Sequence, residues 1–161
     1  MNSEAIKKCL DNFQKYCEKH SVKMGYASDI SQSIFSYIIE MRNIMNAVDN
    51  HNTFEMHNHM VLALQAICNF ASANNILVSD CVINRTYTEL FNDTMSFDFE
   101  HSLTLIKEDL DVSKNIQMEE QDKISYVQKG FVSIFPEAYF FDFIKIDRII
   151  NLYIESKNKI N

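Results

Sequence analysis

Apolar residues recur along this chain at the three- and four-residue spacing that places side chains on one face of a helix. The spacing predicts seven helices, over residues 4–19, 28–48, 53–73, 80–94, 98–110 and 122–134 and from Pro136 onward. Between them we expect an extended connection at Ile76–Val78 and a polar loop over residues 111–121. The pattern is therefore typical of an all-helical protein.

The segment 53–73 differs from the other predicted helices because it is apolar almost all round. Only a narrow stripe is polar, consisting of Asn58, Gln65, Asn69 and Ser72. Asn52 is the expected N-cap, with Glu55 in the capping-box position three residues later. Since a helix without a polar face must be buried, we predict an all-α, single-domain bundle of six or seven helices with this helix at its centre, spanning residues 1–161.

The low glycine and proline content excludes several classes of protein. The 161 residues include only 2 Gly and 1 Pro, too few for the tight turns of an all-β fold. Gly25 and Gly130 cannot build a glycine-rich phosphate-binding loop, because such a loop needs several glycines close together. Most nucleotide-binding folds are thereby excluded.

The net charge of −7 disfavours nucleic-acid binding, which depends on basic contacts to phosphates. No apolar segment is long enough to span a bilayer, and charges interrupt the first twenty residues, so we expect neither a membrane span nor a secretion signal. The cysteines, Cys9, Cys17, Cys68 and Cys81, have no zinc-finger spacing. We expect reduced thiols and a cytoplasmic location.

The densest group of potential metal ligands lies around the start of the central helix. His51, Glu55 and His59 are spaced i, i+4, i+8, which would align them on one face of a continuous helix. Zinc and non-haem iron both take such ligands, but neither HExxH nor ExxH is present. We predict no metal or other cofactor and expect His57 to face the core, while whether these three residues bind a metal stays an open question.

Two pairs of acidic residues, each three positions apart, suggest that the protein could instead be an enzyme. Glu108 with Asp111, and Glu119 with Asp122, resemble half of the magnesium-binding pattern of all-helical nucleotide pyrophosphohydrolases. That family also needs an ExxE pair on a neighbouring helix, and this sequence has none. A metal- or nucleotide-dependent helical enzyme is therefore the alternative to a non-enzymatic function, and we predict no catalytic residues.

Nearly all of the net charge comes from one segment, residues 96–122. It carries eight carboxylates against two lysines. The carboxylates are Asp98, Glu100, Glu108, Asp109, Asp111, Glu119, Glu120 and Asp122. Two interpretations are open: a solvated surface that confers solubility, or a partner-binding face that docks onto a basic cleft.

With its acidic stretch Asp98–Asp122, the chain resembles in type the bacterial immunity proteins made alongside contact-dependent or secreted toxins. The resemblance implies a cytoplasmic inhibitor that forms a one-to-one complex with its cognate toxin. It further implies that the acidic face covers a basic active-site cleft, in many cases that of a nuclease. A regulatory protein of a phage or mobile element is a further alternative.

Overall fold

The computed structural model describes residues 3–24, 30–83, 119–135 and 143–160. These residues form six helices and no strand, which confirms the all-helical prediction for the part of the chain described. The helices are α1 (Ser3–Met24), α2 (Ile30–Asp49), α3 (Thr53–Ala73), α4 (Val78–Val82), α7 (Glu120–Ile134) and α9 (Phe143–Ile160).

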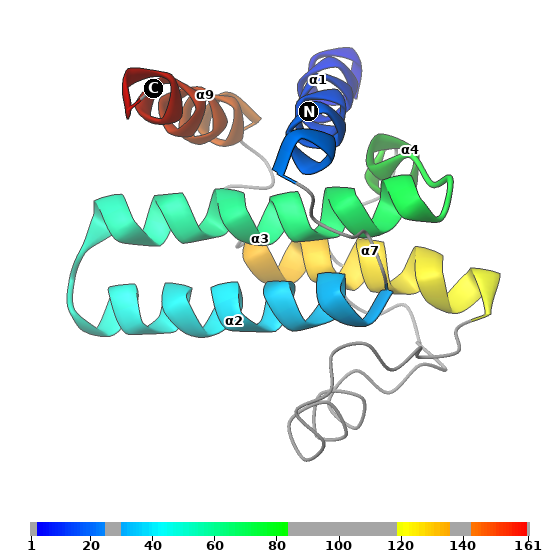
Figure 1. The fold of residues 1–161 in the computed structure, drawn as a ribbon, viewed down its shortest axis with the longest axis horizontal. Helices are drawn as coiled ribbons and strands as arrows, with labels where there is room; N and C mark the ends of the chain where they lie inside the picture. The colour runs from blue at the N-terminus through cyan, green and yellow to red at the C-terminus, as the bar shows by residue number, and fades with distance from the viewer. Residues whose placement is uncertain (1–2, 25–29, 84–118, 136–142, 161) are drawn as a thin grey trace.

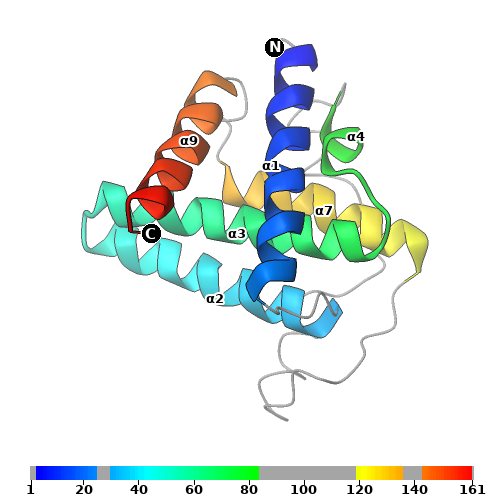
Figure 2. The same cartoon turned by 45° about the horizontal axis from the view of Figure 1, so that its top comes forward.

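The helices form two layers that meet at α3 (Figure 1). Helices α2 and α3 lie side by side as an antiparallel hairpin, with α7 running behind them. On the other side of α3, α1 and α9 cross it steeply, as the turned view in Figure 2 shows. Helix α3 contacts each of the other five described helices, so the prediction of a buried central helix is confirmed.

Local interactions fix both ends of α3. The Asn52 side chain accepts a hydrogen bond from the Glu55 backbone N–H at 3.1 Å, as expected of the N-cap. In a full capping box the Glu55 side chain would accept a hydrogen bond from the Asn52 N–H. Here that N–H donates instead to the Ala47 carbonyl, at 2.9 Å. At the far end Asn75 adopts a left-handed backbone (φ 58°), and the Ile76 N–H donates to the Ala71 carbonyl at 2.8 Å. This arrangement is a Schellman motif, and it ends the helix at Asn74–Asn75.

Aromatic and aliphatic side chains from α3 and α7 form the centre of the core. Leu64 and Ile67 of α3 are completely buried. The Tyr126 ring of α7 packs edge-on against Phe70 at 4.6 Å and against Tyr37 of α2 at 5.8 Å between ring centroids. These contacts hold the α2–α3 hairpin against α7, which lies behind it in Figure 1.

Several predicted boundaries were wrong. Helix α1 continues to Met24 rather than ending near residue 19, and α7 begins at Glu120 inside the predicted loop. Val78 starts a helix instead of ending an extended connection, and α4 ends at Val82, since Ile83 has extended backbone angles. The predicted helix 98–110, most of 80–94 and the start of the last helix at Pro136 lie outside the described residues.

Candidate functional site

The acidic residues singled out from the sequence are only partly within the described chain. Asp98, Glu100, Glu108, Asp109 and Asp111 lie outside the described residues.

Of the remaining three, Glu119 and Glu120 are exposed at the start of α7. Asp122 is not: only 7% of its surface is accessible. Because α7 begins at Glu120, residue 122 falls in its first turn on the side that carries the buried Ser125 and Tyr126. Its carboxylate is favourably placed there for the helix dipole, but it is no part of an exposed acidic face.

A histidine between two carboxylates connects α2 to α3. The His59 Nδ1 atom of α3 lies 2.6 Å from Glu40 Oε2 of α2, and its Nε2 atom lies 3.4 Å from Glu55 Oε2, one turn earlier on α3. The Glu40 and His59 side chains are only 18% and 23% exposed. This bridge fixes the position of Glu40 between the two helices.

His51 is not aligned with Glu55 and His59, because the helix that carries those two residues begins after it, with Asn52 as its N-cap. His51 lies in the turn between α2 and α3, exposed and with a left-handed backbone (φ 54°), so it is not on the face of α3. Glu40 is the residue that the sequence reasoning missed. It comes from a different helix. In the sequence, Glu40 is marked only by its place in a polar stripe along α2, which also includes Gln32, Ser36 and Asn43.

The arrangement does not place three ligands around one point. The two carboxylates approach opposite nitrogens of the His59 ring, so they lie on opposite sides of it. Among the described residues, no group of three or more His, Cys, Asp or Glu side chains is placed to hold a metal ion.

His57 lies between Glu55 and His59 in the sequence but takes no part in the bridge. It is partly buried, and burial together with the nearby Lys145 ammonium of α9 lowers the pKa of its imidazole. Both effects disfavour the charged form of the ring.

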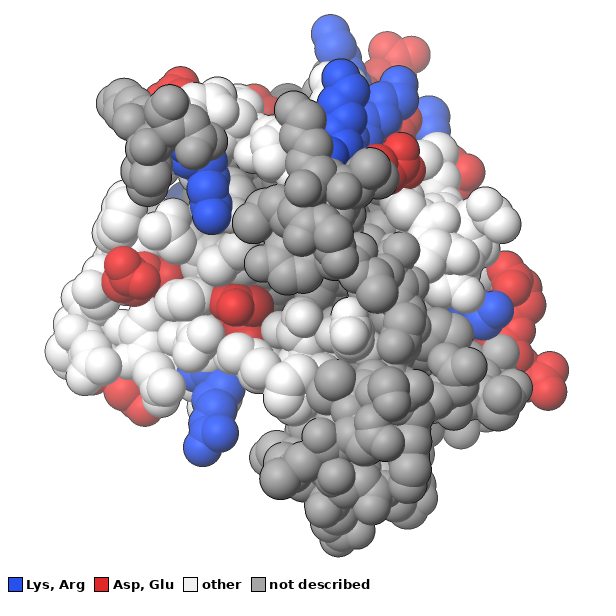
Figure 3. All heavy atoms as spheres, in the orientation of Figure 1, with Lys and Arg blue, Asp and Glu red and all other residues white. Residues whose placement is uncertain are grey.

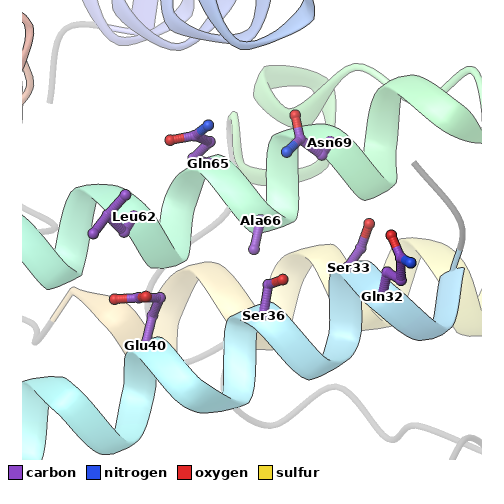
Figure 4. A pocket seen from close by; sticks show the side chains of 8 residues that line it. All are labelled: Gln32, Ser33, Ser36, Glu40, Leu62, Gln65, Ala66 and Asn69. Carbon is purple, nitrogen blue, oxygen red and sulfur yellow. The ribbon is translucent and has the colours of Figure 1, made fainter. Parts of the chain in front are cut away.

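The bridge lies between two hollows on the side of the hairpin that faces away from α7. One has a volume of about 210 Å³ and is lined from both helices, as Figure 4 shows, by Gln32, Ser33, Ser36, Glu40, Leu62, Gln65, Ala66 and Asn69. The other, of about 190 Å³, is lined by Asn43, Asn46, Ala47, Asn50, Asn52, Glu55 and His59. We call the two hollows together the α2/α3 groove.

The α2/α3 groove is polar. Among the residues that the structure describes, amides and hydroxyls make up most of the lining, Glu40 and Glu55 are the acidic groups, and His59 is the one basic group. In the part of Figure 3 that shows described residues, few charged side chains lie over α2 and α3, while basic side chains gather over α1. Those on α1 include Lys7, Lys8, Lys15 and Lys19.

Comparison with known proteins finds no family model, no curated protein and no solved structure that matches this chain. In the described part of the chain, no helix has both the length and the apolar character needed to cross a membrane.

Proposed function

We propose that this chain is a non-enzymatic inhibitor: a cytoplasmic immunity protein that binds and neutralises a cognate toxin, with a nuclease as the expected toxin class. The observation that carries the proposal is the concentration of carboxylates in residues 96–122, eight against two lysines. The exposed pair Glu119 and Glu120 at the start of α7 supports it.

Charge complementarity supplies the mechanism. A nuclease active site is basic because it must bind phosphates, and an acidic protein surface competes for the same cleft. Complementary charges accelerate the encounter and select the partner, and salt weakens both effects because the screening length is about 8 Å at physiological ionic strength. Binding over the cleft excludes the substrate, so inhibition requires no catalytic residue in this chain.

The test compares two charge reversals of equal size. The double variant Glu119→Lys, Glu120→Lys should slow association with the cognate toxin, identified by pull-down and mass spectrometry, by about tenfold at low salt. Asp49→Lys combined with Glu155→Lys, both exposed and on other helices, is the matched control and should have a much smaller effect. Association rates measured by biolayer interferometry at several salt concentrations give the answer.

The control must avoid Asp11 and Glu18 of α1, although their spacing places them on its polar side. Asp11 accepts a hydrogen bond from the Ser79 hydroxyl at 2.5 Å, and Glu18 accepts one from the Ser72 hydroxyl at 2.9 Å. Reversing them would disturb the contacts of α1 with α3 and α4.

Reversal of Glu108, Asp109 and Asp111 to lysine tests the remainder of the acidic stretch. An equal slowing by test and control variants would show that only net charge matters. If pull-down with this chain recovers no toxin that it inhibits, the proposed function is wrong.

A further inference from the structure

We draw no further inference here: the strongest candidate, the exposed apolar surface patch of Met45 and Val48 near the end of α2, carries nothing because no observation on the described part of the chain shows what covers it.

Discussion

The Tyr37 hydroxyl of α2 donates a hydrogen bond to the Gly130 carbonyl of α7 at 3.2 Å, deep in the core. This contact depends on a close approach of α7 to the hairpin. A Cβ atom at Gly130 would lie 2.8 Å from Ile67 Cδ1 and 3.7 Å from Tyr37 Cε2. One of the two glycines of the chain therefore stands where α7 meets both helices of the hairpin.

The first prediction concerns this contact. Gly130→Ala should destabilise the protein by about 1–3 kcal/mol, because the added methyl overpacks the fully buried Ile67. In an Ile67→Val background, which lacks the clashing Cδ1 atom, the same change should be neutral or stabilising, since alanine exceeds glycine in helix propensity by about 1 kcal/mol. Urea unfolding of the four proteins in this double-mutant cycle measures the coupling. Additive effects would contradict the close approach.

Leu64 tests the central position of α3. It is completely buried, so Leu64→Ala should cost about 2–5 kcal/mol in the free energy of unfolding. Leu152→Ala on α9 is the control, because Leu152 is 55% exposed and should cost less than about 0.5 kcal/mol. Chemical denaturation followed by circular dichroism measures both values, and similar losses would show that α3 is not the core helix.

The sequence predicts those features that depend on neighbours in the chain. The cap at Asn52 and the burial of Leu64 follow from spacing alone, because a helix brings residues three and four apart onto one face. The role of Glu40 was not predictable in this way, since its partner His59 lies on another helix. Asp122 was misjudged because charge alone suggested exposure, and only the true start of α7 shows that its side chain is buried.

Gln14 gives a third prediction, which the sequence pattern did not suggest. Buried on α1, its side-chain amide donates to the Ile76 carbonyl at 2.9 Å and accepts from the Val78 N–H at 3.0 Å. Gln14→Met should leave both backbone groups unpaired and cost about 2–4 kcal/mol. Gln121→Met, at an exposed position of α7, is the control. A loss below about 1 kcal/mol for Gln14→Met would show that water replaces these bonds.

A fourth prediction concerns metals. Because the carboxylates of Glu40 and Glu55 lie on opposite sides of the His59 ring, added zinc should leave the melting temperature unchanged. Thermal unfolding with zinc and with chelator measures this, and elemental analysis of the purified protein should find no stoichiometric metal. One zinc per chain that is lost on His59→Ala but kept on His51→Ala would contradict the prediction and favour the enzymatic alternative.

The last prediction is loss of stability at alkaline pH. Burial, with a smaller contribution from Asp147, raises the pKa of the Cys9 thiol to about 12, and burial also raises the pKa values of Cys17, Tyr37 and Tyr126. In the unfolded chain these groups lose their protons near their ordinary values, about 9 for Cys and about 10 for Tyr. Above pH 9 the unfolded state therefore binds fewer protons than the folded state.

Stability should consequently be level between about pH 7.5 and 8.5, above the range in which His57 titrates, and fall between pH 9 and 12. Urea midpoints measured by circular dichroism across this range give the slope. Cys9→Ser removes one of the groups, so its slope should be shallower than that of the parent protein by about 1.4 kcal/mol per pH unit at most. Stability that stays level up to pH 11, or a slope unchanged by Cys9→Ser, would show that these side chains reach water in the folded protein.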